Sequence, residues 1–159
     1  MITEDYVSFE TAKLLKEKGF RENTNRYYNA QYGQIRTVSD IFMTDWNDDD
    51  YMKRILMDGA VAIPTIQMAM KWIQDAHNIV VVPNYEYEFD NTPWCYKIFK
   101  LEENGKPEVV AVKGVSYDKD GNPTEHIVGL RDYERSDSDY ITREEACEAA
   151  IKYCLENLI

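Results

Sequence analysis

Acidic side chains at alternate positions in two loops could coordinate a calcium ion. The spacing occurs at Asp45, Asn47 and Asp49 and again at Asp118, Asp120 and Asn122. A calcium-binding loop also needs a glycine at its sixth position and a bidentate glutamate at its twelfth. The first loop has Asp50 and Leu56 there, and the second loop fails both tests as well. We interpret both segments as solvated loops and expect no bound metal; weak surface binding of a cation is the alternative.

The thiols and imidazoles do not have the spacing of a zinc site. They are Cys95, Cys147, Cys154, His77 and His126, and no C-x₂₋₄-C or H-x₃₋₅-H pair occurs among them. We interpret the helical cysteines as small core residues; a zinc site assembled from distant segments is the alternative.

Cys95 with His126 is the one nucleophile–base pair that adjacent strands could bring together, but ordinary strand positions are the simpler interpretation. Phosphate-binding glycine motifs are absent. We therefore expect no cofactor and no catalytic residues.

One segment combines cationic side chains with aromatic rings. Arg26, Tyr27, Tyr28, Tyr32 and Arg36 all fall between positions 26 and 36. These residues could clamp a single-stranded nucleic acid by stacking, contact another protein, or form an exposed hairpin whose rings lie on the domain. The net charge of −11, from 18 basic and 29 acidic residues, disfavours broad contact with phosphates. If the segment is a contact surface, we expect its partner to be another protein and not a nucleic acid.

A second candidate contact surface is acidic. Asp48, Asp49 and Asp50 are consecutive, and more acidic residues follow between Asp132 and Asp139. A negative field attracts a basic partner, and it also keeps a protein soluble. Both interpretations of this surface stay open.

The length of 159 residues fits one domain, covering 1–159. A content of 44% hydrophobic and 13% aromatic residues is sufficient for a core, so disorder is not expected. No stretch approaches the about 20 apolar residues of a membrane span, and the first residues lack the pattern of a secretory signal. Three cysteines without a plausible disulfide are typical of a reducing compartment. We expect a cytoplasmic protein with no membrane partner; the sequence specifies no oligomeric state.

The last segment of the chain carries the clearest structural signal. Thr142 and Glu145 have the spacing of a capping box, which predicts a helix over about 143–157. From Ala146 to Leu158, apolar residues recur with the helical period and form one wide stripe. Two of the three cysteines lie on this stripe, so we interpret them as core residues of the helix.

Three more helices are predicted upstream. Ser8 is a suitable N-cap for a helix over 9–18. A helix over 64–77 should begin with Pro64 in its first turn, where the missing N–H is not needed, and Asn78 suits its C-terminal cap. Asp48 could cap a short helix that runs through Met57.

From position 79 the apolar residues recur with a period of two, which indicates strands with one buried face. Strands are expected over about 79–89, 94–101, 108–117 and 124–130, joined as an antiparallel four-stranded meander over residues 79–130. A small hairpin is expected over 26–38, and 131–140 should be a polar loop. Because helices and strands occur in blocks, the predicted class is α+β. The helices over 64–77 and 143–157 should cover the apolar face of the meander.

Three segments carry a resemblance to known sequences. They are DYVSFETAKLLKEKGF (5–20), PTIQMAMKWI (64–73) and EEACEAAIKYCLENLI (144–159). The chain resembles a group of short uncharacterised proteins of gut-dwelling anaerobic bacteria and their phages and mobile elements. The resemblance implies a bacterial or phage cytoplasmic protein and assigns no functional residues. A sheet followed by the last helix also loosely resembles the HicB-type antitoxin partial fold, as an analogy of fold alone.

Two functional hypotheses follow from the sequence. The first is a small non-enzymatic acidic protein that binds another macromolecule through the 26–36 hairpin and the acidic residues around Asp48. The second is a small-ligand-binding module or enzyme with a site between the meander and that hairpin. A concave pocket of a few hundred Å³ with aromatic lining would favour the second hypothesis, and a flat acidic face the first.

Overall fold

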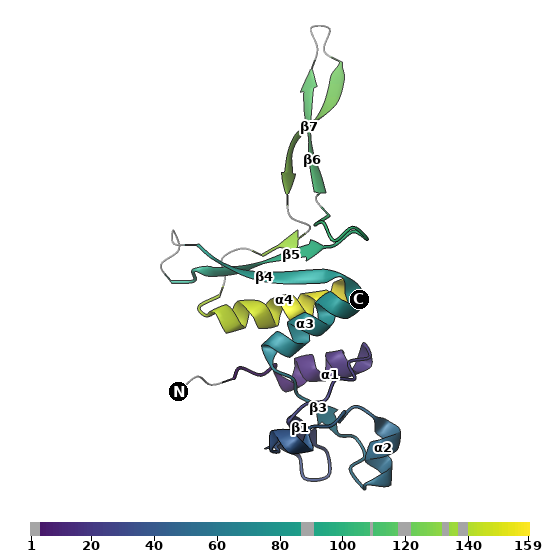
Figure 1. Ribbon diagram of the computed structural model, residues 1–159. Helices are drawn as coiled ribbons and strands as arrows, with labels where there is room; N and C mark the ends of the chain where they lie inside the picture. Colours follow the sequence, from purple (N-terminus) through teal and green to yellow (C-terminus); the bar gives the residue numbers. More distant parts are fainter. Residues whose placement is uncertain (1–3, 87–90, 109, 118–121, 132–133, 137–139) are drawn as a thin grey trace.

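The computed structural model describes residues 4–86, 91–108, 110–117, 122–131, 134–136 and 140–159 (Figure 1). Its elements in chain order are α1 (Phe9–Glu17), β1 (Arg26–Asn29), β2 (Gln34–Thr37), the 3-10 helix η1 (Asp40–Phe42), α2 (Asp49–Arg54), β3 (Val61–Ala62), α3 (Ile66–His77), β4 (Ile79–Tyr85), β5 (Trp94–Lys100), β6 (Val110–Tyr117), β7 (Pro123–Arg131), β8 (Glu134–Arg135) and α4 (Arg143–Asn157). Helices and antiparallel strands occur in blocks, and the predicted α+β class is confirmed.

The predicted caps of the first and last helices are present. Ser8 Oγ accepts a hydrogen bond from the Thr11 N–H at 3.2 Å and so caps α1. Both halves of the capping box form at the start of α4, where Thr142 Oγ1 accepts from the Glu145 N–H and the Glu145 carboxylate accepts from the Thr142 N–H. These side chains satisfy backbone donors that the first helical turn leaves without a partner.

The predicted boundaries of the two middle helices need correction. Thr65 is the N-cap of α3, so Pro64 lies before the helix and not in its first turn, although Asn78 ends the helix in the left-handed conformation as predicted. Asp48 caps α2 as predicted, but the helix ends at Arg54 and not at Met57. The reason is that Leu56 has a φ of 59°, which no α-helix accommodates.

Three antiparallel sheets form in the described part of the chain. The N-terminal half has the order β2-β1-β3, and the other two sheets are β4-β5-β8 and β6-β7. The predicted small hairpin is β1 with β2, where Arg26 pairs with Thr37 and Asn29 with Gln34. Pro83 lies in β4, an edge strand of its sheet, as its missing N–H requires.

The predicted four-stranded meander is not confirmed. The position beside β5 is taken by β8, which pairs through Glu134 and Arg135 although 131–140 was expected to be a loop. After its turn the chain pairs only briefly with the end of β5, through a bridge between Leu101 and Pro107 and a hydrogen bond from the Glu108 N–H to the Lys100 carbonyl. Strands β6 and β7 then pair with each other and project away from the sheet (Figure 1). No other described helix or strand makes more than marginal contact with this hairpin.

The core lies between the β4–β5 part of its sheet and the helices. Figure 1 shows α3 and α4 together under this sheet, with α1 beneath them and the β1–β3 sheet and α2 further away. The inward face of α4 is fully buried along its length, at Ala146, Cys147, Ala150, Ile151, Cys154 and Leu155. This face contacts β4, β5, α1 and α3, so the last helix joins the other elements into one core.

A charge placed in this core should unfold the protein. Ala150 is fully buried, so Ala150→Glu forces a carboxylate without a partner into an apolar site and should cost at least about 4 kcal/mol. Thr142→Ala removes only the cap and should cost about 1 kcal/mol. Gln67→Glu adds the same charge on the exposed first turn of α3 and should be nearly neutral. Denaturant unfolding of the three variants measures these differences; equal small effects would show that α4 is not docked.

Candidate binding cleft and edge surface

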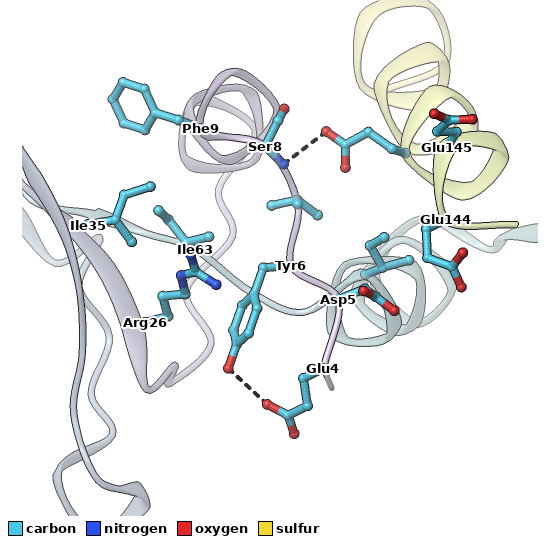
Figure 2. A pocket seen from close by; sticks show the side chains of 13 residues that line it. Glu4, Asp5, Tyr6, Ser8, Phe9, Arg26, Ile35, Ile63, Glu144 and Glu145 are labelled. Atoms are coloured by element: carbon cyan, nitrogen blue, oxygen red, sulfur yellow. Dashed lines mark hydrogen bonds between the residues drawn. The ribbon is translucent and has the colours of Figure 1, made fainter. Parts of the chain in front are cut away.

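An open cleft of about 580 Å³ lies between the N-terminal segment, the β1–β2 hairpin and the start of α4 (Figure 2). Five carboxylates line it, at Glu4, Asp5, Glu144, Glu145 and Glu148. Arg26 is the one cation among the lining residues, and Phe9, Ile35, Ile63 and Ile66 provide apolar wall. The cleft is therefore acidic with an apolar floor.

Backbone hydrogen bonds fix the N-terminal segment that crosses the cleft. The Val7 N–H donates to the Pro64 carbonyl at 3.1 Å, and the Ile66 N–H donates to the Asp5 carbonyl at 2.9 Å. Tyr6 makes an isolated antiparallel bridge with Thr65 between these two bonds. The segment is thereby held along the start of α3 as a short extended strand.

Glu148 connects α4 to the start of α1. Its Oε1 accepts hydrogen bonds from the Ser8 N–H at 3.0 Å and from Thr11 Oγ1 at 2.5 Å. A carboxylate at a helix N-terminus is favourable because the first N–H groups and the helix dipole both attract negative charge. The carboxylate therefore fixes one wall of the cleft against another.

Arg26 and Tyr6 form the opposite wall. The Arg26 guanidinium lies over the Tyr6 ring, 4.4 Å from its centroid. The Tyr6 hydroxyl donates to Glu4 at 2.8 Å, and burial together with this acidic neighbour raises the pKa of Tyr6. The cation is thus held by an aromatic face, in a cleft that is otherwise negative.

Some polar side-chain atoms in the walls of the cleft make no hydrogen bond within the described structure. Three buried side-chain atoms have no hydrogen-bond partner among the described residues, and two of them, Arg26 Nε and Glu148 Oε2, belong to this cleft. Buried polar atoms are normally satisfied because an unmade hydrogen bond is costly. Within the walls of the cleft, one buried donor and one buried acceptor are therefore left without a partner in the described structure.

An exposed apolar surface adjoins the cleft on its β2 side. We call it the edge surface and define it as Tyr32, Ile35, Ile41, Phe42 and Met43, all of which are exposed. Ile41 is 83% and Phe42 65% exposed. Ile35 belongs to both the cleft and the edge surface, so the cleft borders the edge surface at this residue.

The turn that carries Ile41 and Phe42 is anchored at both ends. The Val38 N–H donates to the Asn25 carbonyl at 2.7 Å, and Thr44 pairs with Thr24 in a backbone bridge. Asn25 Nδ2 also donates to Asp40 Oδ1 at 3.1 Å. The exposed apolar side chains are therefore presented on an ordered turn.

The structure divides the predicted aromatic and basic residues between two faces of the hairpin. Tyr27 is buried and stacks on Trp46 with ring centroids 3.8 Å apart, so this ring belongs to the core. Arg26 and Tyr28 are half-buried on the opposite face, which is the face of the cleft. Tyr32 and Arg36 are exposed and stack on each other.

The predicted acidic residues do not form one patch of free carboxylates. Asp48 accepts from the Tyr51 N–H as the cap of α2, and Asp49 pairs with Lys16 Nζ at 2.6 Å. This hydrogen bond from Lys16 lowers the pKa of Asp49. Asp50 is exposed on the first turn of α2. Most of the second acidic stretch, around 132–139, lies outside the described residues.

Several residues of the cleft and edge surface were not predicted from the sequence. The cleft carboxylates are distant in sequence and come together only when α4 docks beside residues 4–8. Ile41 and Phe42 did carry a signal, because two large apolar residues stand in a stretch that is otherwise polar and acidic.

Cys95 and His126, the one pair considered as a possible nucleophile and base, do not lie on adjacent strands. Cys95 lies in β5, which pairs with β4 and β8, whereas His126 lies in β7, which pairs with β6. His77 packs its ring edge-on to Trp72, and burial lowers its pKa, with Lys18 adding to the effect. The described residues contain no cluster of three or more His, Cys, Asp or Glu side chains able to hold a metal ion.

No protein-family model, no curated protein and no solved structure matches this chain. Within the described ranges, no helix combines the length and apolar character needed to cross a bilayer. The function of the protein is therefore inferred from its own residues.

The three thiols should be unreactive while the protein is folded. All three cysteines are buried; burial raises the pKa of Cys154 to about 12 and also raises the pKa of Cys147. Because the thiolate is the reactive form, a thiol reagent at pH 8 should modify the native protein at least about 100-fold more slowly than the unfolded chain. The reaction with Ellman's reagent, with and without denaturant, measures this ratio. A native thiol that reacts at the rate of free cysteine would show an accessible nucleophile and contradict this account.

Proposed function

We propose that the protein binds another protein through the edge surface and the adjoining acidic cleft. The observation that carries this proposal is the concentration of exposed apolar side chains in one short stretch. Five of the eleven exposed large hydrophobic residues in the described chain lie between Tyr32 and Met43. Scattered exposed apolar residues are normal, but a concentration of them in one region is typical of a contact surface.

The anchoring of the η1 turn supports the same proposal. A surface held in one conformation loses little conformational entropy when it binds, so more of the contact energy appears as affinity. Phe42 is an aromatic side chain, the type most enriched in contact surfaces, and it lies next to Ile41. The hydrogen bonds at Val38 and Asn25 keep both side chains exposed without help from a partner.

The cleft supports a second candidate function, the binding of a small cationic ligand. Its volume of about 580 Å³ is within the range of small-molecule sites, and its lining carries five carboxylates against one arginine. Its location differs from the site that the sequence suggested. Arg26 and Ile35 of the hairpin line it, but the other walls come from residues 4–9, 63, 66 and the start of α4, and no residue of the β4-β5-β8 sheet takes part.

A matched pair of surface variants tests the proposed function. Ile41→Ser with Phe42→Ser removes the apolar centre of the edge surface, and Val82→Ser with Tyr85→Ser removes exposed apolar side chains from β4. Each immobilised variant is compared with the wild type for proteins retained from an extract of the producing cells. A specific partner should be retained by the wild type and the β4 variant, and should bind the η1 variant at least about tenfold more weakly.

Thermal unfolding of both variants serves as the control for folding, because each replaces only exposed side chains. A partner that binds the η1 variant as tightly as the wild type would contradict the proposed function.

A further inference from the structure

Strand β2 is an open edge of the β2-β1-β3 sheet. All four of its residues are exposed, and in the described part of the chain only β1 pairs with it. The opposite edge is different: Val61 and Ala62 of β3 are buried, and the Ala62 N–H donates to Asn47 Oδ1 at 2.9 Å. An open edge offers a row of backbone donors and acceptors to another strand.

The usual protections of an edge strand are scarce in β2. It contains no proline, and its pairing with β1 runs through four consecutive residue pairs without a bulge. Its single charged side chain, Arg36, is stacked on Tyr32. Natural proteins normally block exposed edges with charges, prolines or bulges, so this edge is available for pairing.

One face of β2 leads directly into the acidic cleft. Ile35 is paired with Tyr28, on the same face as Arg26, and both Ile35 and Arg26 line the cleft. Because side chains alternate between the two faces of a sheet, a strand added beside β2 would direct every second side chain toward the cleft. Its other side chains would point to the opposite face.

We propose that an extended segment of another protein, in which basic and apolar residues alternate, adds to β2 as a fourth strand of this sheet. This inference rests on the proposed function and specifies the chemistry of its partner. Charge selects the segment: five cleft carboxylates against one arginine favour lysine or arginine on the side that faces the cleft. The apolar positions lie on the opposite face, beside Arg36 and the Tyr32 ring, and the added backbone takes up the free edge.

Charge also argues against a second copy of this chain as the occupant. Each copy carries a net charge of −11, so two acidic clefts would face each other across a symmetric β2–β2 contact. Like charges placed across an interface oppose association. A basic segment of a different protein relieves this repulsion.

The test uses a synthetic peptide of about ten residues in which lysine and valine alternate. Hydrogen exchange followed by NMR on the full chain should show at least about tenfold slower exchange of the outward amides between Gln34 and Thr37 when the peptide binds. A peptide with glutamate in place of lysine should bind at least about tenfold more weakly. N-methylation of alternate peptide bonds should cause a similar loss, because it removes backbone donors.

Charge variants identify the cleft as the source of the selectivity. Asp5→Asn with Glu144→Gln should weaken the lysine–valine peptide by about fivefold. The matched control, Glu17→Gln with Glu103→Gln, removes two exposed carboxylates elsewhere and should change the affinity less than twofold.

Strand addition would be overturned if the peptide bound without protecting residues 34–37, or if the glutamate peptide bound equally well. It would also be overturned by equal binding of a linear polyamine that has no peptide groups, or by a dimer of the free protein that already protects β2. The proposed function fails differently, through a partner that is indifferent to Ile41→Ser with Phe42→Ser. A partner that depends on η1, combined with no protection of β2, overturns strand addition alone.

Discussion

The burial of one face of α4 is the constraint on which the rest of the structure depends. This helix comes last in the chain, yet its apolar face contacts β4, β5, α1 and α3. Short side chains such as Ala146 and Ala150 are fully buried there, which lets neighbouring elements approach closely. Since the first and last helices meet, the core is complete only when the end of the chain has docked. The cleft depends on the same event, because Glu148 of α4 holds the start of α1 through Ser8 and Thr11.

The β1–β2 hairpin is asymmetric, and this asymmetry produces the surface that we propose as a contact surface. On one face Tyr27 is buried against Trp46, and that contact secures the hairpin to the domain. On the other face Ile35 remains exposed beside the cleft, and the strand edge stays without a partner in the described structure. Apolar residues on an open edge favour aggregation unless a partner covers them. The negative charge of the chain opposes self-association, which is why we propose a basic partner for this edge.

Local signals in the sequence predicted most elements but not their assembly. Ser8, Asp48 and Thr142 predicted their helices because a cap acts on hydrogen bonds only a few residues away. The four-stranded meander was not confirmed, because strand pairing is decided by competition between distant segments. The two-residue strand β8 takes the edge of β5, and no periodicity is detectable in so short a strand. The end of α2 was misplaced because Leu56 adopts a positive φ, which its residue type does not indicate.

The candidate site was also predicted only in part, because it too depends on the assembly of distant segments. The segment from Arg26 to Arg36 was identified by its composition, and it does border the cleft and supply part of the edge surface. Its burial pattern was not predictable, because whether a tyrosine packs inward, like Tyr27, or outward depends on which face of the hairpin meets the core. The carboxylates of the cleft come from both ends of the chain, so only the docking of α4 brings them together.

Native-state hydrogen exchange tests the central role of α4 most directly. If the last helix completes the core, its amides between Ala150 and Leu155 should exchange only through global unfolding, with the free energy that denaturant unfolding gives. The amides of β6 and β7 should exchange through local opening at a much lower free energy, because no other described helix or strand makes more than marginal contact with this hairpin and a two-stranded hairpin alone is marginally stable. The account is contradicted if the amides of α4 exchange well below the global free energy while those of β6–β7 reach it.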